Sequence, residues 1–565
     1  MNPDRPLVVQ SDRTLLLEVD HPMYGQVRDA LARFAELEKS PEYIHTYRIT
    51  PLSVWNALAA GMPPADIVSS LEGYSKYPVP ESVATEIGSW AERYGRIRLV
   101  RVEGTLRLLT DDARLLEEIR AQEYAARHLG EAVSDREVLI DEIERGRVKQ
   151  ALLTLGYPVD DLAGYTPGAP LEITLREETL EGQPFSLRAY QKAAADVFHA
   201  GGSERGGSGV VVLPCGAGKT MVGIGAMHRV QTHTLILCTN VTAMRQWIRE
   251  ILDKTNLTED EVGEYSGRSK EIKPVTVSDY QILTYRRKKT DPFLHFGLLS
   301  DHPWGLIIYD EVHLLPAPVF RVTAEIQARR RLGLTATLVR EDNKESDVFT
   351  LVGPKRYDVP WKVLEKQGWI AKAICIEVRV PLMDQLRSRY LAAKSREQFR
   401  IASENENKNS VVKRILERHS GDRVLIIGQY IDQLVLLSKQ LGVPLITGKT
   451  KQAERDELYA AFREGTVPVL CVSKVGNFSV DLPDANVAVQ ISGTFGSRQE
   501  EAQRLGRILR PKRKATSAYF YALVTAETRD QEFAAKRQLF LTEQGYSYEI
   551  RTEASFDHAA AGGGA

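Results

Sequence analysis

The chain has 565 residues, of which 43% are hydrophobic and 26% charged, and its formal net charge is −1. This length exceeds what one hydrophobic core supports, so we expect roughly three or four domains of an ordinary globular protein. The near-zero charge excludes an overall electrostatic signature of a nucleic-acid binder, although a local basic groove can lie on a neutral protein.

The four cysteines are scattered along the chain, and no two of them form a CxxC pair. This spacing argues against a zinc site or an iron–sulfur cluster and favours a reducing compartment. No apolar run approaches the ~20 residues that a membrane-spanning helix needs. The first residues also lack the apolar core of a signal peptide. We therefore expect a soluble, cytoplasmic protein.

Short helical pieces broken by turns are predicted for residues 1–90. Leu31 to Leu37 have helical apolar spacing, and Thr50 before Pro51 is typical of a helix N-cap. The run Gly61 to Pro64 ends that helix, and another begins at Ala65. Residues 1–90 are therefore interpreted as a helical N-terminal module.

A small α+β domain is predicted for residues 91–182. Its first part alternates apolar and polar residues like a strand pair, with a turn at Glu103-Gly104. The predicted elements are a hairpin over Ile97–Leu109, a helix over Ala113–His128, a strand over Glu137–Ile140 and a helix over Gly146–Leu155.

Continuous apolar runs alternate with amphipathic helices from residue 183 onward, and such runs indicate strands buried on both faces of parallel sheets. The runs are Gly209–Leu213, Thr234–Leu237, Leu306–Tyr309, Val424–Ile427, Val467–Val472 and Val487–Gln490. They fall into two sets, which we interpret as two tandem α/β domains over residues 183–378 and 379–555. A charged helical stretch at about 383–415 opens the second domain, and residues 556–565 form a low-complexity tail expected to be disordered.

The turn after the first of these runs has the composition of a phosphate-binding loop. Gly216 and Gly218 allow backbone N–H groups to converge on phosphate oxygens at the start of a helix. Lys219 would reach the β- and γ-phosphates, and the Thr220 hydroxyl would bind Mg²⁺. The general GxxxxGK[ST] pattern fails at its first position, which is Leu213. The loop is therefore closer to a PxGxGK[ST] form.

Asp310 and Glu311 follow an apolar strand about 90 residues later. An aspartate at a strand end can hold the magnesium ion, and the adjacent glutamate can act as general base on the attacking water. A lone Asp-Glu pair at a strand end is usually solvated surface, and its combination with Lys219 favours the functional interpretation. Together these residues predict a hydrolase of Mg²⁺-bound nucleoside triphosphates.

A basic segment of the second α/β domain is a candidate for contact with the same phosphates. Arg507 and Arg510 are three residues apart and so share one helix face, and Gln503 precedes them in the same segment. Arginines aimed at a γ-phosphate accelerate hydrolysis by roughly 10³–10⁵ in arginine-finger enzymes. The alternative is a solvated basic helix, because the positive run continues through Pro511–Lys514.

Taken in chain order, these motifs resemble those of superfamily 2 helicases over roughly Phe185 to Tyr546. The resemblance implies ATP as the nucleotide and Mg²⁺ as the metal. It also implies that Arg188 and Gln191 recognise the adenine. Thr335 and Thr337 lie in a segment that looks like motif III, which couples the nucleotide site to the second domain.

Three features resemble the XPB family in particular. The first is the motif Asp310-Glu311-Val312-His313, which does not have a DEAD-type ending. The others are the triplet Arg340-Glu341-Asp342 and the long stretch from Ser473 to Arg510. The triplet looks like the family's RED motif, which is implicated in DNA opening, although it could also be a polar turn. In the N-terminal region, His45–Arg48 and Ser75–Pro80 are similar to bacterial members.

The resemblance implies a 3′–5′ DNA helicase or translocase that opens forked duplex DNA in nucleotide excision repair or transcription. It also implies a thumb-like insertion at 383–415 that grips DNA and a damage-recognition-like domain at 91–182. Two alternatives stay open: a translocase that moves on duplex DNA without separating strands, and an ATPase scaffold that recruits a nuclease partner. The sequence also leaves open the physiological pathway, the nuclease partner and the oligomeric state. It does not decide whether the N-terminal domains bind damaged DNA or protein.

Overall fold

The computed structural model describes residues 2–31, 33–39, 43–59, 61–164, 167–202, 206–214, 216–288, 293–295, 297–315, 319, 329–336, 348, 351–359, 361–473, 485–493, 517–543 and 546–556. The chain divides into two compact units. The first holds most of the described residues up to Asp358, and the second holds those from Val359 onward together with Pro214, Gly216 and Ala217. No helix among these residues is long and apolar enough to cross a membrane.

The chain begins with a small antiparallel sheet of strand order β1-β2-β4-β3. Its elements are β1 (Leu7–Val9), β2 (Thr14–Glu18), α1 (Tyr24–Leu31), β3 (Glu36–Lys39) and β4 (Ile44–Arg48). The purely helical interpretation of residues 1–90 was therefore wrong for its first half. The strands are three to five residues long, too short to show a clear alternation, and the apolar residues after Leu31 fold into a turn and β3 rather than into a helix.

Three helices follow the sheet, and the first two begin close to the positions that the sequence predicts, after Thr50 and near Ala65. They are α2 (Pro51–Ala59), α3 (Pro64–Tyr74) and α4 (Glu81–Arg93). Thr50 caps α2, since its Oγ1 accepts the Ser53 backbone N–H at 3.0 Å while the Ser53 hydroxyl accepts the Thr50 N–H. Apolar side chains from these helices, α1 and the sheet form one core of their own.

Residues 97–161 form a five-stranded sheet of order β7-β8-β6-β5-β9 with a separate core. Its elements are β5 (Ile97–Val102), β6 (Thr105–Thr110), α5 (Ala113–Ala121), α6 (Glu123–Ala126), β7 (Ala132–Ser134), β8 (Glu137–Ile140), η1 (Glu142–Glu144), α7 (Arg145–Thr154) and β9 (Val159–Asp161). Glu103 and Gly104 both have positive φ, 48° and 81°. This is the backbone that a two-residue hairpin requires, so the predicted turn is confirmed.

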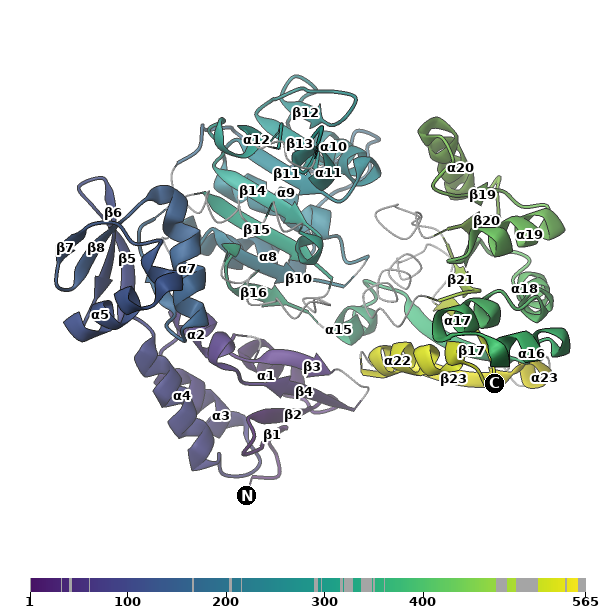
Figure 1. The fold of residues 1–565 in the computed structure, drawn as a ribbon, viewed down its shortest axis with the longest axis horizontal. Coiled ribbons are helices and arrows are strands. Elements are labelled where there is room, and N and C mark those ends of the chain that lie inside the picture. The colour runs from purple at the N-terminus through teal and green to yellow at the C-terminus, as the bar shows by residue number, and fades with distance from the viewer. Residues whose placement is uncertain are drawn as a thin grey trace. The chain divides into compact units, whose positions relative to one another are not determined.

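A seven-stranded, all-parallel sheet follows in the order β12-β13-β11-β14-β15-β10-β16 (Figure 1). The strands are β10 (Ser208–Val212), β11 (Thr234–Cys238), β12 (Val262–Tyr265), β13 (Val275–Asp279), β14 (Leu306–Asp310), β15 (Arg330–Thr335) and β16 (Lys355–Asp358). All seven end at the same edge of the sheet. Residues that follow different strands can therefore meet there although they are far apart in sequence.

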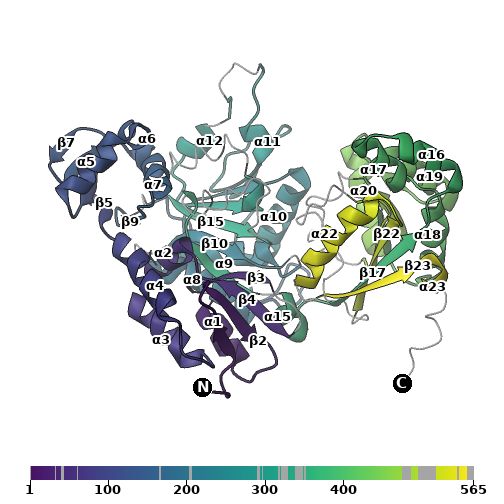
Figure 2. The same ribbon diagram turned by 60° about the horizontal axis from the view of Figure 1, so that its bottom comes forward.

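Helices flank this sheet (Figure 2). They are α8 (Ala189–His199), η2 (Ala200–Gly202), α9 (Lys219–Val230), α10 (Val241–Lys254), α11 (Tyr280–Leu283), α12 (Gly297–Ser300) and η3 (Val312–Leu314). Gly223 of α9 lies so close to Trp247 of α10 that a Cβ would come within 2.3 Å of the indole ring. This close approach brings the Trp247 side chain near the carboxyl edge of β14.

The second unit contains another seven-stranded parallel sheet, of order β19-β20-β18-β21-β22-β17-β23. Its strands are β17 (Lys372–Val380), β18 (Val424–Ile427), β19 (Leu445–Ile446), β20 (Val469–Val472), β21 (Val487–Gln490), β22 (Ser517–Thr525) and β23 (Ser547–Thr552). Because β17 belongs to this sheet, the two sheets are divided between Asp358 and Lys372, earlier than the predicted boundary at 378.

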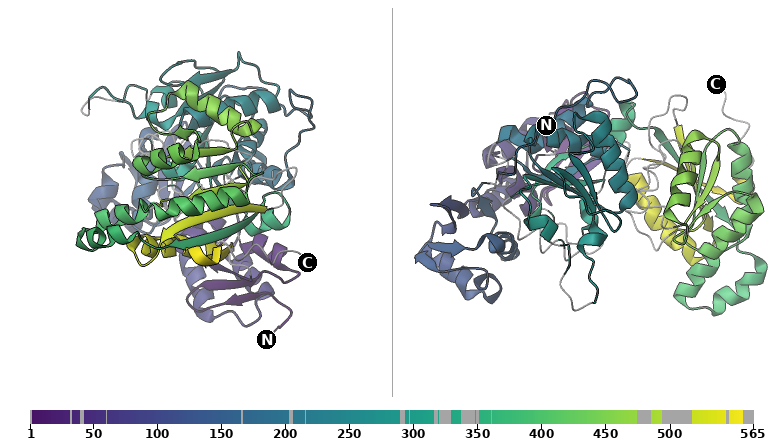
Figure 3. Two further views of the ribbon diagram at one scale, coloured as in Figure 1. Left: turned by 90° about the vertical axis from the view of Figure 1, so that its right-hand side faces the viewer. Right: turned by 90° about the horizontal axis from the view of Figure 1, so that it is seen from above.

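Helices lie on both sides of the second sheet (Figure 3). The helices of this unit are α15 (Trp361–Lys366), α16 (Asp384–Ala392), α17 (Ser395–Ser403), α18 (Asn407–Arg418), α19 (Ile431–Leu441), α20 (Gln452–Glu464), α22 (Arg529–Glu543) and α23 (Glu553–Phe556). Side chains of α18 and α19 join the strands in one core, whereas Phe533 of α22 packs on Phe399 of α17 with ring centroids 5.0 Å apart. The charged stretch at 383–415 is helical, as predicted.

Candidate active site

The turn between β10 and α9 has the backbone that the glycine pattern predicts. Gly216 and Gly218 have φ values of 82° and 80°, in the left-handed region that favours glycine. A Cβ on Gly218 would also come within 2.6 Å of the Gln191 side-chain nitrogen. Lys219 then begins α9, followed by Thr220 in its first turn. The turn therefore requires glycine for conformation and for space, and it leads into a helix N-terminus, which attracts anions.

Two residues outside the predicted site hold Asp310 at the end of β14. The Trp247 indole N–H donates to Asp310 Oδ2 at 3.1 Å, and the Tyr280 hydroxyl donates to the Asp310 backbone oxygen at 2.9 Å. Sequence reasoning missed both residues, because a tryptophan on the apolar face of α10 and a tyrosine after β13 look like ordinary core residues. Their role depends on which strand ends lie side by side.

Glu311 adopts a left-handed backbone conformation, with φ 50° and ψ 54°. This conformation is unfavourable for a residue with a Cβ, and such residues gather at functional sites. Its Oε1 accepts a hydrogen bond from Lys219 Nζ at 2.7 Å. Its Oε2 is buried and makes no hydrogen bond to any residue that the structure describes. One oxygen of the carboxylate is thus left for a further polar group.

His313 connects Glu311 with the end of β15. Its Nδ1 lies 2.7 Å from Thr335 Oγ1 and 3.5 Å from Glu311 Oε2. Both His313 and Thr335 are buried. The sequence motifs indicated the segments that contain His313 and Thr335, but they did not predict the contact between these two side chains.

The two carboxyl groups at the end of β14 differ electrostatically. Burial, together with the neighbouring charge of Glu311, raises the pKa of Asp310 to about 6. Burial also opposes ionisation of Glu311, but the charges of Lys219 and His313 and the hydrogen bonds to the carboxylate outweigh it and lower its pKa. Adjacent carboxyl groups with pKa values pushed apart are typical of catalytic sites.

The segment before α8 adjoins the glycine turn. The Arg188 backbone N–H donates to Gln191 Oε1 at 3.0 Å, and the Arg188 guanidinium donates to the Tyr190 hydroxyl at 3.2 Å. Gln191 is only 3% exposed, and its amide nitrogen faces Gly218. The structure therefore brings Gln191 to the glycine turn, as a nucleotide-contacting role would require.

The donor set fits a magnesium-bound nucleoside triphosphate. Gly218 leaves no space for a Cβ, Lys219 supplies a cation, and Glu311 has a buried oxygen without a hydrogen bond among the described residues. Other predicted site residues lie outside the described part of the chain, so the structure leaves their roles as predictions. These residues are Thr337, Arg340, Glu341, Asp342, Gln503, Arg507 and Arg510.

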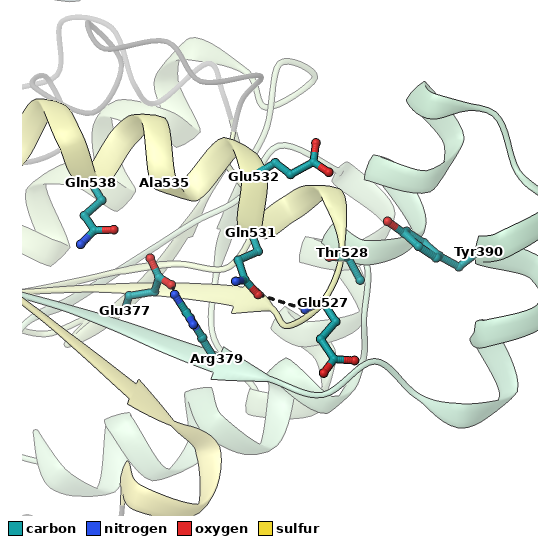
Figure 4. A pocket seen from close by; sticks show the side chains of 9 residues that line it. All are labelled: Glu377, Arg379, Tyr390, Glu527, Thr528, Gln531, Glu532, Ala535 and Gln538. Carbon is teal, nitrogen blue, oxygen red and sulfur yellow. Dashed lines mark hydrogen bonds and ion pairs between the residues drawn. The ribbon is translucent and has the colours of Figure 1, made fainter.

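The second unit carries a separate hollow of about 410 Å³ between β17, α16 and α22 (Figure 4). Two of its polar side chains are already satisfied by neighbours. Glu377 accepts hydrogen bonds from Arg379 at 3.0 Å and from the Tyr548 hydroxyl at 2.9 Å. Gln531 accepts the Glu527 backbone N–H at 3.0 Å. Nothing in this hollow points to a ligand.

Two parallel seven-stranded sheets in tandem, with a glycine turn and a strand-end Asp-Glu pair on the first, define a tandem RecA-like protein of the helicase type. Residues 364–561 match the ERCC3/RAD25/XPB C-terminal helicase family. Residues 184–340 match the type III restriction enzyme res subunit family, and residues 7–134 match a family described as helicase conserved C-terminal domain. The chain belongs to the XPB family of superfamily 2 DNA helicases.

Relatives match over nearly the whole chain. A DNA 3′-5′ helicase XPB of Mycobacterium tuberculosis is 54% identical, over 97% of this chain and 98% of the relative. The general transcription and DNA repair factor IIH helicase/translocase subunit XPB/SSL2 of Saccharomyces cerevisiae is 33% identical, over 97% of this chain and 72% of the relative. A solved structure of S. cerevisiae Dbp5 bound to RNA and ADP BeF3 is similar in fold, with a TM-score of 0.50 and 13% identity over 67% of this chain and 92% of that one.

Proposed function

We propose that this protein is an ATP-dependent 3′–5′ DNA helicase and translocase that opens forked duplex DNA. The observation that carries the proposal is the 2.7 Å contact of Lys219 with Glu311, beside Asp310, at the carboxyl edge of the first parallel sheet. The near full-length identity of 54% with a relative named DNA 3′-5′ helicase XPB supports the direction of movement and the substrate.

Hydrolysis would use residues at the carboxyl edge of the first sheet. Backbone N–H groups of the glycine turn and the Lys219 ammonium bind the triphosphate of ATP, and Arg188 and Gln191 recognise the adenine. Lys219 then exchanges its contact with Glu311 for phosphate oxygens. Glu311 accepts the proton of the attacking water at Oε2, the oxygen that makes no hydrogen bond to a described residue. Thr220 and Asp310 would hold Mg²⁺, which neutralises charge that develops on the phosphates.

The remaining predicted residues and domains complete the proposal. Arg507 and Arg510 stabilise the charge on the transferred phosphoryl group, with Gln503 beside them in the segment. Thr335 and Thr337 couple hydrolysis to movement, and Arg340, Glu341 and Asp342 act where the duplex opens. The α+β domain at 91–182 and the helices at 383–415 add contacts to DNA, and a separate protein supplies any nuclease activity.

ATPase and strand-displacement assays on forked DNA with a 3′ or a 5′ tail test this proposal. We expect DNA-stimulated ATPase, displacement with the 3′ tail only, and a loss of about 10²-fold or more in turnover for Glu311→Gln, because general-base catalysis contributes at least this much. Glu81→Gln, an exposed carboxylate in the first turn of α4, is the matched control and should behave like the wild type.

The two alternatives give different results in the same assays. Stimulation by duplex DNA without strand displacement would favour a translocase that does not unwind. An ATPase that no DNA stimulates would reject the proposal and leave the scaffold interpretation.

A further inference from the structure

The backbone carbonyl group of Asp310 belongs to the peptide bond that leads into Glu311, the general base of the proposed reaction. Glu311 has a left-handed backbone, with φ 50° and ψ 54°. A residue with a Cβ keeps such a backbone only where its surroundings hold it there. Because the peptide is planar, the direction of the Asp310 carbonyl and the φ of Glu311 change together. A group that binds this carbonyl therefore also holds the backbone of Glu311.

The order of the strand ends brings a tyrosine to this carbonyl. The pairing of β11 with β14 ends at Tyr309, one residue before Asp310. On its other side β11 pairs with β13 as far as Asp279, the residue before Tyr280. The Tyr280 hydroxyl donates to the Asp310 backbone oxygen at 2.9 Å. This hydrogen bond thus joins the end of β13 to the end of β14 beyond the last paired position of β11.

Tyr280 is itself held in place by its surroundings. It is 4% exposed and belongs to the same buried core as Tyr309 and Val312, which flank the Asp-Glu pair. It is also the first residue of α11, where the Asp279 carboxylate accepts the Ile282 backbone N–H at 2.8 Å. This contact caps the one-turn helix. The core and the cap together determine where the Tyr280 hydroxyl lies.

Trp247 binds a different part of Asp310. Its indole N–H donates to the carboxylate oxygen Oδ2 at 3.1 Å, and this carboxylate is the group that would bind Mg²⁺. Tyr280 binds the backbone oxygen instead. The two contacts therefore have separate consequences, since Trp247 orients the metal-binding side chain and Tyr280 orients the peptide of Glu311.

The backbone of Glu311 decides where its carboxylate lies. In the present conformation Oε1 lies 2.7 Å from Lys219 Nζ, and Oε2 is buried without a hydrogen bond to a described residue. Rotation of the Asp310–Glu311 peptide would turn the Cα–Cβ bond of Glu311 and displace Oε2. A displacement of about 1 Å in a reacting group is enough to slow catalysis by about 10²-fold.

We propose that Tyr280 is a positioning residue for the general base. By holding the Asp310 carbonyl, its hydroxyl keeps the Glu311 backbone left-handed and Oε2 directed at the attacking water. Asp279 contributes through the cap that fixes Tyr280. This assignment rests on the proposed function, in which Glu311 is the base, and it deepens that function by adding a residue to the hydrolysis step.

Single-turnover ATP hydrolysis by the full-length protein with saturating forked DNA measures this step. We expect Tyr280→Phe to slow hydrolysis about tenfold, which is the order of effect of one hydrogen bond. The KM for ATP and the Mg²⁺ concentration for half-maximal ATPase should keep their wild-type values, because Lys219 and the Asp310 carboxylate are unchanged.

Tyr47→Phe is the matched control for the loss of a buried hydroxyl. Tyr47 lies in the same unit and is 2% exposed, and its hydroxyl makes no hydrogen bond to a described residue. This variant should hydrolyse ATP at the wild-type rate.

A double-mutant cycle shows whether Tyr280 acts through Glu311. Glu311→Gln has no base to position, so in that background Tyr280→Phe should change the residual rate by less than about twofold. The cap of α11 gives a second, independent variant. Asp279→Ala should slow hydrolysis as Tyr280→Phe does, whereas Asp279→Asn keeps a capping oxygen and should retain the rate.

The outcomes separate this role from general packing and from the helicase proposal. A wild-type rate in Tyr280→Phe, or an equal loss in Tyr47→Phe, contradicts the role of Tyr280. A loss that persists in the Glu311→Gln background contradicts it too, as does an increased requirement for Mg²⁺. An ATPase that no DNA stimulates contradicts the helicase proposal instead, and slower hydrolysis in Tyr280→Phe alone would then still support the positioning role.

Discussion

His313 Nδ1 lies 2.7 Å from Thr335 Oγ1, and this buried contact joins the residue pair at the end of β14 to the end of β15. The same imidazole nitrogen lies 3.5 Å from Glu311 Oε2. A change in the position of the Glu311 carboxylate can therefore reach the segment after β15 through one side chain. In a motor protein such a connection would transmit the state of the nucleotide.

Thr335→Val removes the hydroxyl while keeping the shape of the side chain. The buried His313 ring then loses a hydrogen-bond partner, and we expect the free energy of unfolding to fall by about 1–3 kcal/mol. DNA-stimulated ATPase should fall more than basal ATPase, because His313 no longer ties Glu311 to β15. Urea unfolding and steady-state ATPase measure the two effects. Thr335→Ser keeps the hydroxyl and should retain the wild-type free energy of unfolding and the wild-type DNA-stimulated ATPase rate. If Thr335→Val lowers the basal and the DNA-stimulated ATPase rates equally, Thr335 has no coupling role.

Trp247→Phe removes the hydrogen bond to Asp310 Oδ2 and retains an aromatic ring against Gly223. We expect the concentration of Mg²⁺ needed for half-maximal ATPase to rise about tenfold, since partners that orient metal-binding carboxylates typically contribute this much. This concentration is measured by titrating the ATPase rate with Mg²⁺.

Trp304→Phe is the control for that change. Its indole N–H donates to the Leu298 backbone oxygen at 2.7 Å, at the opposite end of β14, and this variant should keep the wild-type magnesium dependence. The same increase in both variants would show that Trp247 acts only through general packing.

Asp161→Asn should destabilise the α+β domain by about 3 kcal/mol, because the buried Arg145 and the largely buried Lys149 would lose the carboxylate that they share. Asp161 lies 2.6 Å from the Arg145 guanidinium and 2.9 Å from Lys149 Nζ. Burial opposes ionisation of Asp161, but these two cations outweigh it and hold its pKa well below the ordinary value of 3.8.

The sign of the pH dependence follows from that lowered pKa. The stabilisation is complete above about pH 5, where the unfolded carboxyl is ionised, and it is lost as the pH falls through the lower folded value. The difference in unfolding free energy between wild type and Asp161→Asn should be constant from pH 5 to 8 and should shrink below pH 4. Asp111→Asn, which breaks an exposed pair with Arg96, should change stability by less than about 1 kcal/mol. A difference that grows on acidification would contradict the assignment.

Lys408→Met should destabilise the second unit by about 3–5 kcal/mol, as expected when one partner of a buried ion pair is removed. Lys408 Nζ lies 2.8 Å from Asp530 Oδ2 and 3.0 Å from the Ile491 backbone oxygen, and both charged side chains are almost fully buried. Lys413→Met, an exposed lysine on the same helix, is the control and should have little effect. Chemical unfolding followed by circular dichroism measures both, and equal small effects would mean that the pair contributes nothing to stability.

Much of the fold and part of the site could be predicted because their signals are local. The continuous apolar runs became β10, β11, β14, β18, β20 and β21, since a strand buried on both faces needs apolar residues throughout. The hairpin at Glu103-Gly104 and the cap at Thr50 depend on neighbouring residues alone. The early strands β1–β4 were missed because each is too short to impose a period on its own sequence.

By itself the sequence determined the chemistry available to this protein: a glycine turn that accepts phosphates, a lysine at the start of a helix, and an Asp-Glu pair at a strand end. Only the tertiary structure decided which of these groups meet. The parallel order β14-β15-β10 places Lys219 and Glu311 in contact across 92 residues of sequence, and it adds Trp247, Tyr280 and the His313–Thr335 contact. The physical reason is that hydrogen bonding between non-consecutive strands sets which strand ends are neighbours, and this depends on packing of the whole sheet rather than on any one segment.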